Sequence, residues 1–244
     1  MSSVGNYTQY YLKWHKDTDA HRNGLRTFYH RLIGPYLPKD PSASILDVGC
    51  GMGFALHYLR LQGYVNIAGI DTDSGQVKLA SQNSLPVTLV TDSVAFLKKS
   101  PTKIDFLLCL DVLEHLPKSL HLDFLSSIYQ ALKPKGRLIL SVPNANSSIA
   151  ARWRYNDWTH ETSFTEHSLD FVLSNAGFQR ITIQPAEFVL RPRLSFLPIS
   201  GSRHWWAFCF FRLFRRLEMM AELGPEQGRK IPLSLNLMAI ADKS

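Results

Sequence analysis

Cysteine is scarce in this 244-residue sequence, and its spacing excludes two kinds of fold support. The three cysteines, Cys50, Cys109 and Cys209, lie far apart, and no Cys-x-x-Cys pair indicates zinc binding or redox chemistry. Two of them stand in apolar runs, where a reduced and buried thiol is the usual state. We expect a protein of a reducing compartment without a disulfide framework.

Long apolar runs are absent as well. No eighteen consecutive residues are apolar, and the first residues, MSSVGNYTQYYLKWHKD, lack the apolar core of a signal peptide. Internal repeats and low-complexity tracts are also missing, which argues against solenoid and disordered classes. We therefore expect a cytoplasmic globular protein that at most docks peripherally at the inner face of a membrane.

Negative charge is in the minority, since the formal net charge is +7. Much of the excess lies in one late segment, which holds Arg191, Arg193, Arg203, Arg212, Arg215 and Arg216. A local cluster favours a local anionic surface over a nucleic-acid footprint that covers the whole protein. No stripe of basic and aromatic residues indicates a stacking platform, so nucleic acid is not the expected partner.

Apolar runs alternate with helical patterns along most of the chain. Strands are predicted at 44–49, 65–71, 86–92, 104–111 and 137–144, with helices between them at 53–63, 74–83, 94–99 and 116–133. A helix at 166–177 and strands at 178–186 and 233–243 follow. Near-continuous apolar strands are typical of a parallel sheet covered on both faces. The pattern predicts a doubly wound α/β fold.

Turn residues divide the chain into an arm and a main domain. The segment GPYLPKDPSAS separates an N-terminal helical arm or lid, residues 1–43 with one helix at 18–32, from the domain at 44–244. Within that domain we predict an acceptor loop at 144–165. More than forty residues separate the last two strands, so the insertion at 187–232 is a candidate for function.

The glycine turn DVGCGMG lies where an open parallel sheet binds ligands, beyond the end of the first strand. In a dinucleotide fingerprint the third glycine stands five residues after the first, beside the pyrophosphate. Here the glycines are Gly49, Gly51 and Gly53, and Phe54 holds that later position. Gly53 has a second interpretation, namely that it only lets helix and strand approach.

Carboxylates surround this turn. Asp47 belongs to the turn, Asp71 ends the second strand and Asp92 ends the third, so a polyphosphate would be repelled. Ribose hydroxyls, an adenine amine and a cationic sulfonium suit such a ring, because carboxylates accept hydrogen bonds. That combination describes S-adenosylmethionine. For Asp92 the alternative is a cap for the helix that begins near Ser93.

These motifs resemble those of the class I S-adenosylmethionine-dependent methyltransferases. They read ILDVGCGMG, GID, TDS, DFLLCLDVLEHL and LKPKGRLILSVPN, and the resemblance runs in order from about residue 44 to 178. It implies a seven-stranded, mostly parallel, Rossmann-like α/β sheet with an antiparallel last strand at 233–243. It also implies that the donor contacts come from Asp47, Gly49, Gly51, Asp71, Asp92, Leu110 and Asp111.

Methyl transfer to a hydroxyl requires alignment and removal of a proton, which a histidine near neutrality or a divalent ion can assist. His115 follows the fourth strand in DVLEH, and His160 lies in the loop RYNDWTHETSFTEHS after the fifth. We expect the two to approach each other across the acceptor pocket. His115 has an alternative role, in capping and packing the next helix.

Two metal-using branches share part of this pattern. Small-RNA 2′-O-methyltransferases carry acidic-x-x-Glu-His and a later histidine, and ubiquinone-pathway O-methyltransferases carry a similar early motif. Asp111 stands where the RNA branch has glutamate, so a divalent metal is an alternative that is not favoured, and no metal ligand is assigned.

A closer overall resemblance is to methyltransferases associated with bacterial surface polysaccharide and glycolipid synthesis. It rests on Pro143-Asn144, RYNDWTHETSFTEHSL and AGF at 176–178. It implies that His160 is a base or acceptor contact, that Asp157 orients it, and that Thr165 caps the following helix. His167, inside that helix, is expected at the surface.

The late insertion holds a basic amphipathic helix at 202–224. Projected at 100° per residue, one arc of about 100° carries Trp206, Phe210, Leu213, Phe214 and Leu217, while Arg212, Arg215 and Arg216 share another. This favours docking at an anionic membrane surface. Packing on its own sheet and a dimer seam are the alternatives, and the oligomeric state is not predicted.

The first hypothesis is therefore an O-methyltransferase that acts on a sugar hydroxyl of a small-molecule or lipid-linked glycan precursor. The alternatives are a quinone or phenol O-methyltransferase, a metal-dependent RNA 2′-O-methyltransferase, and an inactive donor-binding interaction protein. The donor in each case is S-adenosylmethionine.

Overall fold

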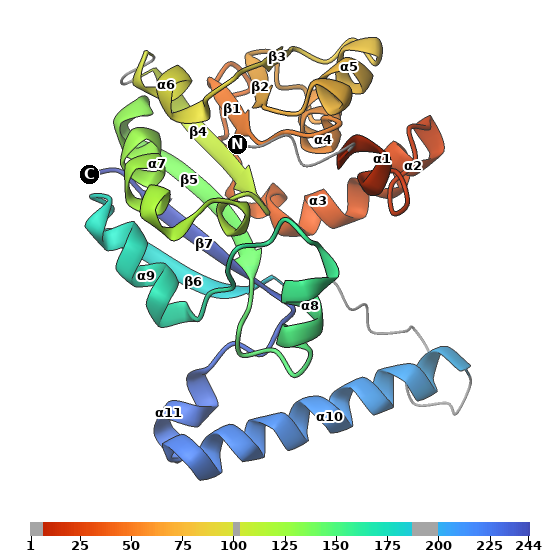
Figure 1. The fold of residues 1–244 in the computed structure, drawn as a ribbon, viewed down its shortest axis with the longest axis vertical. Coiled ribbons are helices and arrows are strands. Elements are labelled where there is room, and N and C mark those ends of the chain that lie inside the picture. Colours follow the sequence, from red (N-terminus) through yellow and green to blue (C-terminus); the bar gives the residue numbers. More distant parts are fainter. Residues whose placement is uncertain (1–6, 100–102, 187–199) are drawn as a thin grey trace.

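The computed structural model describes residues 7–99, 103–186 and 200–244, and its centre is one seven-stranded sheet (Figure 1). The strand order is β3-β2-β1-β4-β5-β7-β6. The strands are β1 (Ile45–Val48), β2 (Ile67–Asp71), β3 (Val87–Leu89), β4 (Ile104–Leu110), β5 (Leu132–Pro143), β6 (Arg180–Ala186) and β7 (Asn236–Asp242). Strands β1 to β5 pair in parallel, and β7 runs antiparallel to both β5 and β6. The predicted fold class, including the antiparallel last strand, is confirmed.

Helices cover both faces of the sheet. On one face lie α3 (Arg26–Leu32), α4 (Phe54–Leu61) and α5 (Ser74–Gln82), and on the other α6 (Ser93–Lys98), α7 (Lys118–Ala131) and α9 (Glu166–Asn175). Successive strand residues supply the two cores in turn: Phe106 and Leu108 pack on the first face, Leu107 and Cys109 on the second. This alternation explains why the strands read as continuous apolar runs.

The strand order reverses at β1, whose neighbours are β2 and β4. In an open α/β sheet, ligands bind at such a point, beyond the carboxyl ends of the strands. The segments that follow β1, β2 and β4 therefore meet at one crevice.

Helix α7 ends earlier than the sequence indicates. Pro134 and Gly136, which we expected to stop the helix, lie inside β5, because α7 ends at Ala131 and the strand begins at Leu132. The pairing of β4 with β5 shifts register between Ile104 and Phe106, opposite this segment. A proline without an N–H is tolerated in a strand at such an irregularity.

The N-terminal arm also differs from the expectation of one helix at 18–32. It forms α2 (Asp19–Gly24) and α3, which meet at Leu25, and a short helix α1 (Tyr7–Tyr11) precedes them. The sequence did not predict α1, the short helix α8 (Ala150–Asn156) of the acceptor loop, or α11 (Pro225–Lys230). Helices this short have little periodicity for a pattern to detect. Two 3₁₀ turns, η1 (Gly34–Tyr36) and η2 (Leu113–His115), complete the elements.

Helix α9 begins with a reciprocal cap. Thr165 Oγ1 accepts from Ser168 N at 3.2 Å, and Ser168 Oγ accepts from Thr165 N at 3.0 Å, so serine does the work that Glu or Gln does in a capping box. The predicted cap is confirmed, and His167 lies at the surface as expected.

Helix α10 (Ser200–Leu223) stands apart from the sheet and packs mainly against α11 (Figure 1). The first part of the insertion, residues 187–199 with Arg191 and Arg193, lies outside the described residues. Among the residues that the structure describes, no helix combines the length and apolar composition needed to cross a membrane.

Candidate active site

The glycine turn after β1 is built on left-handed backbone. Gly49, Gly51 and Gly53 have φ values of 74°, 53° and 76°. A Cβ on Gly49 would lie 2.3 Å from Val112 Cγ2, so a side chain there would displace the segment after β4. A Cβ on Gly53 would meet Leu85 Cδ1 at 2.4 Å, which fits its alternative role in close helix–strand approach.

Asp71 holds this turn against the end of β2. Its Oδ2 accepts from Gly51 N and its Oδ1 from Asp73 N, both at 2.8 Å. Each oxygen keeps a further lone pair, so the carboxylate can still accept hydroxyl donors. Burial raises the pKa of Asp71 above its usual range.

Asp47 lies within β1 rather than in the turn, and only 3% of its surface is exposed. Burial, and then the nearby charge of Asp71, raise the pKa of Asp47 to about 7. Tyr11 of α1 lies near the same carboxylates. Burial, and then the charges of Asp111, Asp71 and Asp47, raise the pKa of Tyr11 well above its usual value. The carboxylates therefore form one acidic group that Tyr11 borders.

Leu110 ends β4, and Asp111 follows it with a φ of 55°. One carboxylate oxygen of Asp111, Oδ1, accepts from Ser141 Oγ at 2.9 Å and from Asn236 Nδ2 at 2.8 Å. Ser141 and Asn236 belong to β5 and β7, so two further strands orient this side chain. Desolvation of the carboxyl raises the pKa of Asp111.

Asp92 caps α6. Its Oδ1 accepts from Val94 N at 2.8 Å and from Ala95 N at 3.1 Å, and the residue is exposed. The alternative role that we gave Asp92 is therefore present, while its contact with adenine stays a prediction.

The chemistry of this crevice fits S-adenosylmethionine. Gln76 Oε1 is buried without a hydrogen-bond partner, 2.6 Å from the point that a Cβ on Gly51 would occupy. A buried unpaired acceptor is unfavourable unless a donor meets it. Together with Asp47 and Asp71 it offers acceptors and negative charge, which suit ribose hydroxyls and a cationic ligand and disfavour a polyphosphate.

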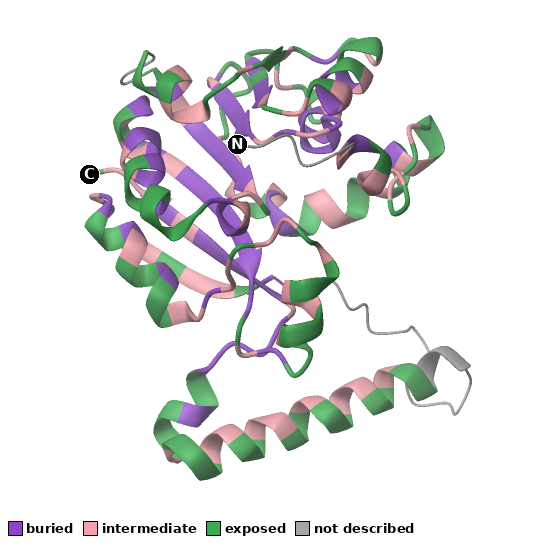
Figure 2. Ribbon diagram, viewed as in Figure 1, coloured by how far each residue is buried: buried purple, intermediate pink, exposed green. Residues whose placement is uncertain are grey.

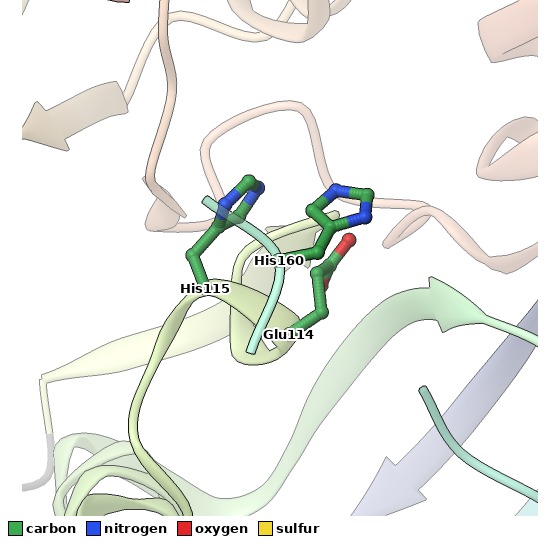
Figure 3. A group of neighbouring side chains, drawn as sticks. All are labelled: Glu114, His115 and His160. Carbon is green, nitrogen blue, oxygen red and sulfur yellow. The ribbon is translucent and has the colours of Figure 1, made fainter. Parts of the chain in front are cut away.

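The second part of the site joins η2 to the acceptor loop. Glu114 and His115 come from η2 and His160 from the loop, and the rings of His115 and His160 lie 4.7 Å apart at 67° (Figure 3). The loop is tied to η2 by Glu161 N, which donates to Glu114 O at 2.7 Å. The structure thus brings together the two histidines that the sequence singled out.

Asp157 acts on His115 through Thr159. Thr159 Oγ1 donates to Asp157 Oδ1 at 2.7 Å and lies 2.8 Å from His115 Nδ1. A hydroxyl carries one proton, so Thr159 accepts from His115 Nδ1–H, and Nε2 of His115 carries the lone pair. The carboxylate oxygens of Asp157 accept from Thr159 and Tyr7, and its backbone oxygen accepts from His160 N at 3.3 Å. That Asp157 orients the His160 side chain stays a prediction.

Burial keeps both histidines neutral near pH 7. Desolvation and the nearby His160 lower the pKa of His115 to about 4, and desolvation lowers the pKa of His160. Desolvation, with the charge of Asp111, raises the pKa of Glu114 well above its usual range. Glu114 Oε2 and His160 Nδ1 are buried without a hydrogen-bond partner, so both are available to bind a substrate group that enters the site.

One ligand atom each from Glu114, His115 and His160 lie within 4.8 Å of one another. Two neutral imidazoles and a carboxylate are a donor set that divalent ions accept. An ion there would bind the carboxylate form of Glu114, and its positive charge would oppose the rise in pKa that burial causes.

Helix α1 connects the two parts of the site. Tyr7 OH donates to Asp157 Oδ2 at 3.2 Å, Tyr10 OH to Asn156 O at 2.6 Å, and Thr8 Oγ1 to Asp73 Oδ1. The roles of Tyr7, Tyr11 and Thr159 were not predicted from the sequence. The sequence shows a cluster of tyrosines in YTQYY and a threonine next to His160, but neither feature indicates which distant residue it contacts.

A doubly wound sheet with an acidic, nucleoside-fitting crevice at its switch point defines a class I S-adenosylmethionine-dependent methyltransferase. The chain belongs to the family described as "Methyltransferase domain", whose sequence profile matches residues 18–183.

Curated relatives and solved structures agree with this assignment. A ubiquinone biosynthesis O-methyltransferase of Rickettsia bellii is 31% identical over 140 residues, which cover 54% of this chain and 57% of that protein. The match thus spans little more than half the length of that relative. A SAM-dependent methyltransferase of Archaeoglobus fulgidus superposes with a TM-score of 0.69 at 21% identity, covering 98% of this chain and 100% of that one. Phosphoethanolamine N-methyltransferase 2 of Haemonchus contortus, solved with S-adenosyl-L-methionine, gives 0.59 at 16% identity, covering 99% and 60%.

Proposed function

We propose that this methyltransferase methylates the ring hydroxyl of a quinol or related phenol. The observation that carries the proposal is the neutral His115–His160 pair, with His115 held through Thr159 so that its Nε2 is unprotonated. The similarity to ubiquinone biosynthesis O-methyltransferases supports this alternative over the sugar hydroxyl that we placed first. Polysaccharide or glycolipid synthesis has no support from these comparisons.

The donor, when bound, supplies an electrophilic methyl carbon on a sulfonium. In the proposal Asp71 holds the ribose hydroxyls, Asp47 and the glycine turn face the methionine part, and Leu110 and Asp111 line the pocket. The task of the remaining site residues is to place one hydroxyl in line with the methyl carbon and to take its proton.

The acidity of the acceptor favours a phenol. A histidine whose pKa is about 4 is a weak base. A phenol ionises near pKa 10, as in tyrosine, whereas an aliphatic hydroxyl resembles water at about 15.7. Proton transfer to His115 is therefore easier from a phenol by roughly six pKa units. A sugar hydroxyl would need a stronger base or a metal ion.

The acceptor loop also carries an exposed aromatic side chain close in sequence to His160. Trp158 lies two residues before His160, and 89% of its surface is exposed. Exposed tryptophan is a suitable stacking partner for a ring, because the pair gains both apolar burial and an aromatic contact. We assign Trp158 to the acceptor side of the site.

The test compares acceptors with one methyl-labelled donor. Purified protein is given a catechol with a short prenyl tail, a nucleotide-linked sugar, and an oligosaccharide on a lipid carrier, each with and without a chelator. We expect label in the catechol, at a rate that the chelator leaves unchanged. Label in either sugar acceptor alone would overturn the proposal. Loss of activity with chelator, restored by a divalent ion, would make Glu114, His115 and His160 metal ligands and would overturn the general-base assignment.

A further inference from the structure

Helix α10 presents an apolar face that is largely exposed. Its bulky side chains are more than half exposed, with relative exposures of 58% for Trp206, 63% for Phe210, 65% for Phe211, 59% for Leu213, 64% for Phe214 and 52% for Leu217. Figure 2 shows exposed residues recurring along α10 from residue 203 onward, the part whose burial is described. A helix that belonged to the core would bury this stripe, so the expected alternative of packing on its own sheet is wrong for the described structure.

Helix α10 is attached to α11 near its C-terminal end. Arg216 Nη1 donates to Gly228 O at 2.6 Å and to Ile231 O at 2.7 Å, which joins α10 to the C-terminal end of α11. A Cβ on Gly228 would lie 2.6 Å from Met220 Cα, so the two backbones are in close contact there. Helix α11 therefore packs on the side of Arg216 and Met220, while the side chains from Phe210 to Leu217 named above keep more than half of their surface exposed.

Positive charge accompanies the apolar arc. Between residues 203 and 217 the helix carries Arg203, Arg212, Arg215 and Arg216 and no acidic residue. The arginines lie mostly outside the apolar arc, and Arg212 lies over the Phe208 ring at 4.8 Å. Acidic residues appear only later, where Glu218 pairs with Arg215 at 2.6 Å. Arg229 and Lys230 of α11 add two exposed cations.

We propose that α10 docks this enzyme onto a membrane surface that contains anionic phospholipid. A 24-residue helix is about 36 Å long, enough to lie flat in the interface with its apolar arc among the acyl chains. Tryptophan and phenylalanine enter the boundary region, and arginines at the flanks meet the lipid phosphates. The charge of the helix selects this occupant: a lipid headgroup complements the arginines, whereas a second copy of the same face would bring more arginines.

The docking does not depend on the proposed acceptor, and vesicle binding measures it without catalysis. The protein is mixed with vesicles of phosphatidylcholine alone, or with about one third phosphatidylglycerol, and recovered by flotation. We expect binding to the anionic vesicles and weak binding to the neutral ones.

Two variants and one control make the test specific. The double variant Phe210→Ser/Phe214→Ser should lower partitioning at least about tenfold, because two buried rings are lost. Arg203→Gln should lower binding about fivefold, on anionic vesicles only. The control Phe171→Ser changes a side chain that is 63% exposed on α9 and should bind like the wild type. Thermal melting checks that each variant is folded.

Three results would overturn the proposal. The wild type fails to float with anionic vesicles, the double variant floats as well as the wild type, or the control loses binding to the same extent. A measurement of the molar mass in solution tests whether a second copy of the chain covers this face instead. A wild-type dimer that the double variant dissociates, together with no vesicle binding, would make this face a subunit interface instead.

Discussion

At the scale of single residues, the hydroxyl of Thr159 stands between a carboxylate and an imidazole. It donates to Asp157 and accepts from His115, so its one proton determines which nitrogen of His115 is free. Asp157 is close to His160 in the sequence, but its carboxylate bonds to Thr159, which in turn bonds to His115. Thr159 is thus a positioning residue rather than a catalytic one.

Thr159→Val should lower kcat by about tenfold to a hundredfold, because valine cannot pass on the hydrogen bond and His115 can adopt the other tautomer. Thr159→Ser should restore most of the rate, since it keeps the hydroxyl. Donor affinity should be unchanged in both. The pH–rate profile is the second readout: the wild-type rate should fall as the pH drops through about 4, where His115 takes up a proton. A serine variant as slow as the valine variant would remove the relay from the mechanism.

His160→Ala should lower turnover by roughly two to four orders of magnitude while leaving donor affinity nearly unchanged, because His160 packs against the base His115 and faces the acceptor hydroxyl whose proton is removed. The matched control is His167→Ala, because His167 is exposed on α9 and distant from the reacting groups in this account. Labelled-donor kinetics and calorimetric binding measure the two quantities. Equal activity of His160→Ala and the wild type would exclude His160 from the reaction.

At the scale of elements, α1 is a five-residue helix with side-chain hydrogen bonds to segments around the site. It bonds to α5 through Thr8, to the acceptor loop through Tyr7 and Tyr10, and it places Tyr11 beside three carboxylates. So short a helix is not stable alone, so its position depends on these contacts. That residues 1–43 act as a lid stays a prediction.

Tyr11→Ala should weaken binding of S-adenosylmethionine by about tenfold, because the ring that limits water at the carboxylates is lost. Tyr155→Ala, which removes a tyrosine that is 77% exposed on α8, serves as the control and should bind the donor normally. Calorimetry without acceptor measures both. Unchanged affinity in Tyr11→Ala would mean that α1 does not border the bound donor.

At the scale of the whole molecule, buried carboxylates make the unliganded protein sensitive to pH. Asp47 has a pKa of about 7 when folded, above its ordinary 3.8. A raised folded pKa means that the folded state holds the proton more tightly. The contribution of Asp47 to the free energy of unfolding is therefore fully present below about pH 4 and is lost as the pH rises through 7.

Asp47→Asn should therefore raise the melting temperature of the donor-free protein, and raise it more at pH 8 than at pH 5. The shift of about three units sets an upper limit of about 4 kcal/mol on the gain in free energy of unfolding at pH 8. The same variant should bind S-adenosylmethionine more weakly, because a negative charge is lost near the cationic donor. Melting curves at both pH values, with and without donor, test this. A gain that is equal at the two pH values would contradict the raised pKa.

The sequence alone determined the order of elements, the parallel sheet and the edge at which ligands bind. Apolar periodicity is local, and parallel strands bring their carboxyl ends to one edge, so the sequence placed Asp71 and the glycine turn at that edge. Leu110 was named through the family resemblance, and the contacts of all three with the donor stay predictions. Boundaries failed at Pro134 and at Leu25, where the register of a neighbouring strand or a local break decided the outcome.

Only the tertiary structure decided which side chains act together. Thr159 meets His115 across 44 residues, and Tyr7 meets Asp157 across 150. The sequence predicts that the arginines and the aromatic residues of α10 lie on two different arcs of the helix. The direction in which the apolar arc points depends on the hydrogen bonds from Arg216 to Gly228 O and Ile231 O. Helical periodicity indicates that a helix has an apolar face, whereas the packing of segments distant in the sequence determines what that face contacts.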